Sequence, residues 1–267
     1  MTPPIRARAL ASLAALLVAG LAVTGCGSGG PKRTAVNFAA DRPLSVEELR
    51  HAAEQLRHRA ELLGLKAPRV STEGGTLSLS AAGPIADRIE ALTHQLVVEF
   101  RPVLAAGLPD SPTPSGTVPP QLLSQYQALN CSTPARPADP ATGTVACSTA
   151  SPQQPATKLV LGPAALKGAD IAASTAGFEN QWQINLTFTP AGATAFTSLT
   201  TQLSGQPDPA NQLAIVIDGA VVSHPYISQP ITGGQAVISG SFTRAEAETL
   251  AAQLATTDLP AGLHPTA

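Results

Sequence analysis

Asp218, Ser223 and His224 are the side-chain types of a nucleophilic triad, and they lie within a few residues of one another. A triad also requires the histidine to be oriented in space by the third group, and nearness along a strand and a turn does not supply this. The alternative is a structural turn whose Asp-Gly and His-Pro steps set the backbone geometry. We favour the turn and expect a non-catalytic protein; a hydrolase is the competing prediction.

A helical face that carries His51, Glu54 and His58 is the candidate for metal binding. A zinc site needs three or four ligands, and no further ligand is evident near this face. A solvated face explains the three residues, so we predict no metal. Gly233-Gly234 is followed by neither Lys-Ser nor a helix start, so phosphate binding is not indicated and no cofactor is expected.

Cys26 follows Val23-Thr24-Gly25 at the end of the apolar run Ala9–Val23, and Arg6 and Arg8 precede that run. A positive segment, a short apolar run and small residues before a cleavage point are typical of a secretion signal, and the run is shorter than the roughly 20 residues of a membrane span. The four residues from Val23 to Cys26 look like the lipobox of bacterial lipoproteins. We therefore predict a signal peptide over residues 1–25, lipidation of Cys26 and a flexible tether over 26–33. The alternative is an ordinary signal peptide in which Cys26 is incidental.

The other two cysteines, Cys131 and Cys147, form an even pair once Cys26 is assigned to the lipid. In an oxidising compartment such a pair is typical of a disulfide, and closing a loop of about 15 residues contributes around 3 kcal/mol in the chain-entropy model. We predict the Cys131–Cys147 disulfide, with two free thiols as the alternative. Lipidation and the disulfide together place the protein on the extracytoplasmic face of the cell membrane, anchored by its lipid.

Charge and composition argue against nucleic acid as a partner. Loss of residues 1–25 removes two arginines and no acids, so the formal net charge changes from −2 to −4. A mildly acidic chain has no basic footprint for phosphates, and aromatic residues, at 3%, are too scarce for stacking platforms. The remaining 242 residues are enough for one or two domains with their own cores.

The first half of the mature chain predicts a ferredoxin-like base subdomain over residues 34–104. Ser45 and Glu48 form a capping box before a helix, and Gly64 is placed to end it. The element order is strand, helix, strand, strand, helix, strand, which is the split βαβ arrangement. The expected elements are strand 35–39, helix 45–63, hairpin strands 69–71 and 76–80, a helix from 84 to about 95, and strand 96–101.

The second half predicts an α+β head subdomain over residues 158–258, with helices packed on a mixed or antiparallel sheet. Of the 25 prolines, 12 fall between Pro102 and Pro163, so residues 105–157 are expected to be an irregular connector held by the disulfide, and 259–267 a tail. The expected head elements are strands 158–161, 181–188, 213–217, 220–222 and 236–239, and helices that begin after Thr189 and Thr243.

Several stretches resemble the first large extracytoplasmic domain of SecD, the accessory subunit of the bacterial preprotein translocase. They cover most of residues 45–258 in the family's order, and the cysteine pair before Leu161 resembles that of actinobacterial members. The resemblance implies a base and a head of mixed α+β structure. The stretches that carry it are Leu56–Gly64, Val97–Val103, Leu161–Pro163, Leu186–Phe196, Ala214–Pro225 and Ile238–Thr243.

The resemblance also implies partners: exported unfolded polypeptides or subunits of the Sec translocase. SecD continues into transmembrane helices that couple proton flow to motion, and we expect none here, hence a lipid-anchored accessory module rather than a motor. The first residues to consider for polypeptide binding are Trp182 and, on the turn between strands, Asp218, His224 and Tyr226. The alternative is an envelope lipoprotein that binds a small molecule or a cell-wall component, which a concave apolar pocket of several hundred Å³ with convergent polar groups would favour.

Overall fold

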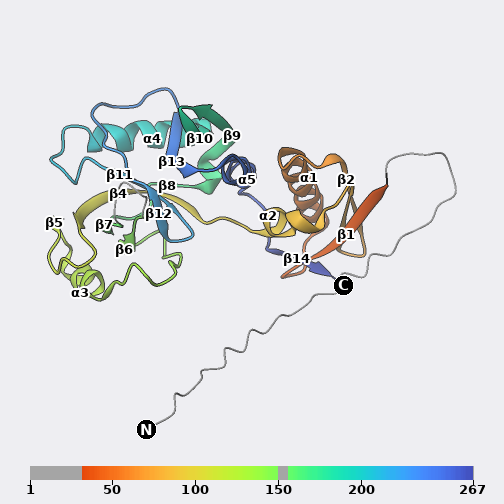
Figure 1. The fold of residues 1–267 in the computed structure, drawn as a ribbon, viewed down its shortest axis with the longest axis horizontal. Helices are drawn as coiled ribbons and strands as arrows, with labels where there is room; N and C mark the ends of the chain where they lie inside the picture. Colours follow the sequence, from red (N-terminus) through yellow and green to blue (C-terminus); the bar gives the residue numbers. More distant parts are fainter. Residues whose placement is uncertain (1–31, 150–155, 267) are drawn as a thin grey trace, which may run out of the picture.

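The computed structural model describes residues 32–149 and 156–266, which form two lobes, a base and a head (Figure 1). The predicted signal peptide and Cys26 lie outside the described residues. Within those residues, none of the helices combines the length and the apolar composition that crossing a bilayer requires.

The base is an antiparallel sheet in the order β14-β1-β3-β2, covered on one side by helices (Figure 1). This is the predicted ferredoxin-like arrangement, and the mixed α+β fold class is confirmed. The alternation of β3 places Leu77, Leu79 and Ala81 in a core with Phe38 and Leu56. The elements are β1 (Arg33–Ala40), α1 (Val46–Leu62), β2 (Lys66–Glu73), β3 (Thr76–Ala82), the 3-10 turn η1 (Ala86–Arg88), α2 (Ile89–Thr93) and β14 (Leu263–Thr266).

Helix α1 begins at the predicted capping box. The Glu48 backbone N–H donates to Ser45 Oγ (3.2 Å), and the Ser45 N–H donates to Glu48 Oε2 (2.8 Å). A hydrogen bond from Arg42, together with those from Ser45, lowers the pKa of Glu48 to about 2. Arg42 also donates to the carbonyl oxygen of Pro260 (2.8 Å), so the start of α1 is tied to the chain that leads into β14.

The predicted fourth strand of the base was wrong. Residues 96–101 do not join the base sheet. The strand there, β4 (Val98–Gly107), pairs in the head with β11 (Leu213–Ile217) and β7 (Lys158–Leu161). The fourth strand of the base sheet is instead β14, which comes from the segment predicted as a tail over 259–267. Alternation of apolar residues specifies a strand with a buried face, but it does not specify which sheet that face covers. The head is therefore inserted into the base between α2 and β14, and the base does not end near residue 104 as predicted.

The head combines two antiparallel sheets, and the largest of its apolar cores lies between them. The larger sheet runs β12-β11-β4-β7-β6, with β5 and β8 also on β4, and the smaller runs β13-β10-β9. A bridge between Ser148 and Val221 joins the outer strands β6 and β12, so the larger sheet curls toward closure. The strands are β5 (Ser115–Gly116), β6 (Thr144–Cys147), β7 (Lys158–Leu161), β8 (Leu166–Lys167), β9 (Ile171–Glu179), β10 (Gln181–Phe188), β11 (Leu213–Ile217), β12 (Ala220–Ser223) and β13 (Gln235–Phe242).

Helices α4 (Pro190–Leu203) and α5 (Arg244–Leu254) complete the head core. Their N-terminal caps, Thr189 and Thr243, are those predicted, and each side chain accepts a hydrogen bond from the first turn. Phe100 of β4 packs edge-on against Phe188 of β10, with ring centroids 5.4 Å apart, and Phe188 lies 4.7 Å from Phe196 of α4. One aromatic cluster thus joins the two sheets and a helix.

The connector predicted over 105–157 is more regular than expected. It contains the end of β4, then β5, α3 (Pro120–Ala128) and β6. The 3-10 turn η2 (Gly168–Asp170) lies after the connector. Leu122 and Tyr126, four residues apart on α3, are buried against the outside of the large sheet. The prolines concealed this helix, because one of them stands at its first position, where proline is tolerated. Cys131 and Cys147 are joined by a disulfide with a Cα–Cα distance of 5.5 Å.

Arg59 of α1 holds both segments that pass between base and head. Its side chain is fully buried, and its Nη1 donates to the carbonyl oxygens of Leu92 and His94, each at 2.9 Å. Nε and Nη2 donate to the hydroxyl and carbonyl oxygens of Thr256, each at 2.7 Å. The first pair lies on the chain entering the head and Thr256 on the chain leaving it, so one guanidinium fixes both crossings.

Replacing Arg59 with methionine should lower the free energy of unfolding by about 3 kcal/mol or more, because buried acceptors left unpaired cost about 1–3 kcal/mol each. Arg57→Met, on the exposed side of the same helix, should cost less than about 1 kcal/mol. Chemical denaturation of both variants measures the difference. Equal decreases in the free energy of unfolding for the two variants would contradict the role assigned to Arg59.

Candidate functional site

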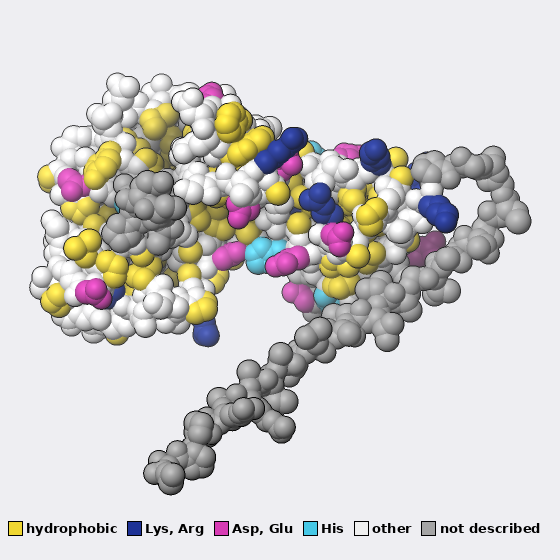
Figure 2. All heavy atoms as spheres, viewed as in Figure 1, with side chains coloured by type: hydrophobic (Ala, Val, Ile, Leu, Met, Phe, Trp, Pro, Cys, Tyr) yellow, Lys and Arg dark blue, Asp and Glu magenta, His cyan; other side chains and the backbone are white. Residues whose placement is uncertain are grey.

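The structure separates the four residues proposed for polypeptide binding. His224 and Tyr226 line one pocket on the head, whereas Asp218 contacts the linker from the base and Trp182 lies on the smaller sheet. In Figure 2, the visible face of the head is mostly uncharged, and charged side chains gather on the base. The pocket with His224 and Tyr226, here called the head pocket, is the candidate binding site, because it brings two of the four residues together.

The head pocket has a volume of about 390 Å³. Two of its side chains are apolar and still largely in solvent: Leu108 is 63% exposed and Tyr226 is 65% exposed. Large apolar side chains left open beside a cavity mark a place where a partner gains by covering them. The lining residues are Ala106, Gly107, Leu108, Ser115, Thr157, Asp208, Pro209, Gln212, His224 and Tyr226.

A short polar network forms one wall of the head pocket. Gln212 Nε2 donates to Asp208 Oδ1 (2.7 Å), which leaves Gln212 Oε1 to accept from His224 Nδ1 (2.9 Å). With Nδ1 as the donor, the neutral ring keeps Nε2 as its acceptor nitrogen. Burial lowers the pKa of His224, so the ring is neutral at neutral pH and the wall carries little positive charge.

Backbone pairing fixes the rim that carries Tyr226. The Leu213 N–H donates to the carbonyl oxygen of Pro225 (3.1 Å), and the Ile227 N–H donates to that of Asn211 (2.8 Å). Tyr226 thus lies between two anchored residues while its ring stays exposed. A rigid aromatic side chain of this kind offers contact area at a low cost in conformational entropy.

Asp218 serves the joint between base and head. It adopts a positive φ of 50° at the turn between β11 and β12, and its Oδ1 accepts from the Val97 N–H (2.9 Å). Its Oδ2 lies 2.8 Å from His94 Nε2, and its own N–H donates to the carbonyl oxygen of Val97 (2.9 Å). The carboxylate therefore holds the linker that enters the head, which the sequence reasoning did not anticipate.

Trp182 belongs to a small aromatic group at the β9–β10 hairpin. Its ring lies 5.4 Å from the ring of Phe178, which is 62% exposed, and 5.7 Å from the guanidinium of Arg244. In the register of the sheet it stands opposite Phe242. This group does not contribute to the head pocket.

The residues considered for catalysis and metal binding do not come together. His224 faces Gln212, while Asp218 faces His94, so the Ser-His-Asp trio forms no hydrogen-bonded relay. His51 Nε2 lies 3.0 Å from Asp258 Oδ2 instead of sharing a ligand with His58. Over residues 32–149 and 156–266, no group of three or more His, Cys, Asp or Glu side chains is arranged to hold a metal ion.

Two buried arginines were missed by the sequence reasoning, although one carried a readable signal. Arg59 falls on the apolar stripe of α1, between Leu56 and Leu63, where a charged side chain is out of place unless it is satisfied internally. Arg101 is also fully buried; it pairs with Glu99 (2.7 Å) and donates to the carbonyl oxygens of Asp139, Thr142 and Gly162. It fastens the connector to the large sheet.

The fold and the site define a class: a mixed α+β module in which a head with a solvent-open pocket is inserted into a ferredoxin-like base. The family model described as the SecDF P1 head subdomain matches residues 145–261. This match confirms the resemblance, found in the sequence, to an extracytoplasmic domain of SecD.

Relatives and solved structures agree with this assignment. The protein translocase subunit SecD of Streptomyces coelicolor is 39% identical over 150 residues, which covers 52% of this chain and 26% of the relative. The subunit SecDF of Thermus thermophilus is 46% identical over 105 residues, covering 39% of this chain and 14% of the relative. The chain thus spans about a quarter or less of these relatives.

Two SecDF structures match 87% of this chain. One, SecDF in a super-membrane-facing form, gives a TM-score of 0.59 at 29% identity, and the match covers 29% of that structure. The other, described as a membrane component that enhances protein export, gives 0.56 at 28% identity and is covered over 98% of its length. Because these matches cover 87% of the chain, they include the base, whereas the family model begins only at residue 145.

Because burial lowers the pKa of His224, its neutral form is favoured in the folded protein, and the unfolded chain binds more protons as the pH falls below the ordinary value of 6.5. The free energy of unfolding should therefore be highest above that pH and decrease between it and the lowered folded pKa. Urea denaturation across this range should show a shallower decrease for His224→Gln than for the wild type. Identical pH profiles would contradict the assignment.

Proposed function

We propose that this chain is a lipid-anchored extracytoplasmic module that takes part in protein export by binding exported polypeptides, without catalysis. The observation that carries the proposal is the SecDF P1 head match over residues 145–261, on a base and head that resemble SecDF over 87% of the chain. One of the SecDF structures is described as enhancing protein export, and we extend that role to this chain. Partners would be unfolded exported chains or subunits of the translocase.

The head pocket supports polypeptide binding by its chemistry. At about 390 Å³ it has room for apolar side chains, and Leu108 and Tyr226 provide open apolar contacts at its edge. Contacts of this kind depend on burial of apolar area and not on a particular sequence. A site with these properties suits a passing, unfolded chain, which presents many different side chains in turn.

The lipid anchor supports the location. Cys26 precedes the first described residue, Lys32, by six positions, and six residues span at most about 20 Å when fully extended. Acylation of Cys26 would hold the base within that distance of the outer surface of the membrane. The head, which is inserted into the base, would then lie on the side of the membrane that exported chains reach.

An envelope lipoprotein that binds a small molecule is the second candidate function. The head pocket lies within the usual range of about 300–1,000 Å³ for ligand sites, which favours this alternative. Against it, the polar groups Asp208, Gln212 and His224 are bonded to one another in the structure. A specific ligand would have to compete for those hydrogen bonds.

Photo-crosslinking in cells distinguishes the two functions. A crosslinking residue at Leu108 or Tyr226 should capture nascent exported proteins, and one at Val46, which is 88% exposed on the base, should not. Tyr226→Ser should reduce capture at position 108 several-fold without changing the amount of protein. Recovery of neither exported chains nor translocase subunits would contradict the export role, and recovery of a small molecule alone would establish the second function.

Lipidation is tested by Cys26→Ser. The variant should lose fatty-acid labelling, and its processed form should no longer sediment with membranes, because the acyl chains supply the apolar area that holds the wild type there. Cys131→Ser/Cys147→Ser is the matched control and should keep the label. Fatty-acid labelling that survives Cys26→Ser would place the modification on another residue.

A further inference from the structure

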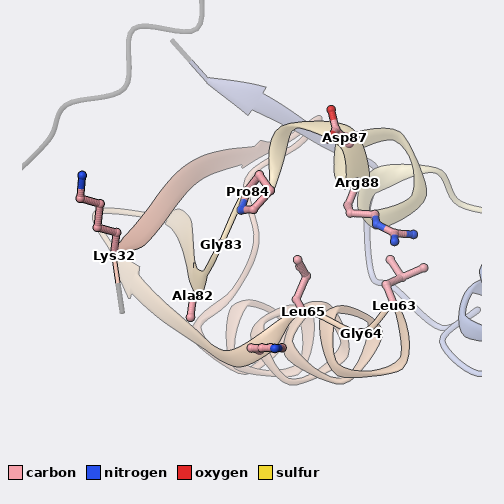
Figure 3. Close-up of a pocket in the computed structure, with 10 residues that line it drawn as sticks. Lys32, Leu63, Gly64, Leu65, Ala82, Gly83, Pro84, Asp87 and Arg88 are labelled. Carbon is pink, nitrogen blue, oxygen red and sulfur yellow. The ribbon is translucent and has the colours of Figure 1, made fainter. Parts of the chain in front are cut away.

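A cavity of about 730 Å³ lies on the base, away from the head pocket, and it is called the base pocket here (Figure 3). Its walls come from the turn after α1, the end of β3 and the 3-10 turn η1, with Lys32 at one margin. Leu63 is buried beneath it and Leu65 is half-buried, so the floor is apolar. The lining residues are Lys32, Leu63, Gly64, Leu65, Lys66, Ala82, Gly83, Pro84, Asp87 and Arg88.

The base pocket carries more positive than negative charge. Lys32, Lys66 and Arg88 line it against a single acid, Asp87, and all four side chains are exposed. Among the described residues, no carboxylate lies within 4.0 Å of any of the three cations, whereas Arg42, Arg57, Arg101 and Arg244 elsewhere are paired. In Figure 3, Asp87 points outward, and Arg88 extends toward Leu63. The acid therefore does little to neutralise the interior.

A cationic rim over an apolar floor matches the chemistry of a phosphate-bearing lipid headgroup. Lysine ammonium groups bind phosphate as point charges, and an arginine guanidinium binds it through paired N–H donors. The glycerol carbons beneath a headgroup would cover Leu65.

The position of the base pocket selects a membrane lipid as the source of the phosphate. Lys32 is six residues from Cys26, so a pocket margin lies within about 20 Å of the point where the acyl chains would enter the bilayer. This step rests on the proposed lipid anchor, whereas the charge of the pocket does not. Attraction to an anionic surface decays over a Debye length of about 8 Å, which a pocket tethered so closely can reach.

We propose that the base pocket binds the headgroup of an anionic phospholipid and thereby orients the base on the membrane surface. A flexible tether alone leaves the body free to rotate. Binding of a headgroup by Lys32, Lys66 and Arg88 fixes one end of the base against the bilayer, and that directs the inserted head away from its own anchor.

The test uses the processed chain with Cys26→Ser, so that no acyl group contributes. Co-sedimentation is measured with vesicles of phosphatidylcholine alone and of phosphatidylcholine with phosphatidylglycerol in equal parts. Binding should appear only with the anionic vesicles. Replacing Lys32, Lys66 and Arg88 with glutamine should lower the partition coefficient by on the order of 100-fold, since each Lys or Arg near such a surface contributes roughly fivefold. The matched control, Arg50→Gln/Arg136→Gln/Lys167→Gln, removes the same charge from exposed sites elsewhere and should retain most of the binding.

Each outcome decides the proposal. Equal losses in the two triple variants would reduce the binding to net charge and overturn it. Saturable binding of inorganic phosphate without binding to anionic vesicles would assign the pocket to a soluble phosphate and also overturn it. The protein here is unacylated, so vesicle binding reports on the base pocket, while fatty-acid labelling and crosslinking report separately on the anchor and on export.

Discussion

The guanidinium of Arg59 is the interaction on which the arrangement of base and head depends. The chain enters the head after α2 and returns from it after α5, and both crossings lie against α1 (Figure 1). Burial lowers the pKa of Arg59 to about 10, so the side chain remains charged at neutral pH inside the joint. Such a charge is tolerated only when its donors are satisfied, and here they are satisfied by the oxygen atoms of the two crossing segments. The arrangement of base and head is therefore specified by directed hydrogen bonds from Arg59 as well as by apolar contacts.

The insertion of the head into the base explains the remaining contacts around the joint. Gln95 Nε2 on the entering segment donates to the carbonyl oxygen of Leu259 on the leaving one (3.0 Å). Asp218 holds the entering segment at His94, and Arg42 holds the leaving one at Pro260. The base sheet is complete only when the chain has returned as β14. The two pockets consequently lie on separate lobes: the one that we propose for polypeptide is on the head, and the one that we propose for a lipid headgroup is on the base.

The sequence indicated single helices and strands more completely than it indicated which strands pair with one another. Helix α1 and the α4 and α5 caps were predicted because Ser45, Thr189 and Thr243 act within one turn of themselves. The partner of β4 was not predictable, since both faces of its first half are buried and its sequence does not indicate which sheet it joins. β14 was too short, and too interrupted by Pro265, to be recognised as a strand.

The candidate site was predicted in part for the same reason. His224 and Tyr226 are close in the chain and share the head pocket, whereas Leu108 joins them from β4's end through long-range pairing. Asp218 does lie in the predicted turn, but its contact with His94 joins positions 124 residues apart. No pattern in the sequence indicates that two such distant segments meet.

The returning strand β14 closes the base sheet. Hydrogen exchange on the chain truncated after Ala261 tests it directly, by comparing amides of β1 with those of β11 in the head. We expect the β1 amides that face β14, between Asn37 and Ala40, to lose protection on truncation, while the β11 amides keep theirs. Unchanged protection of β1 in the truncated chain would show that the base is complete without its last strand.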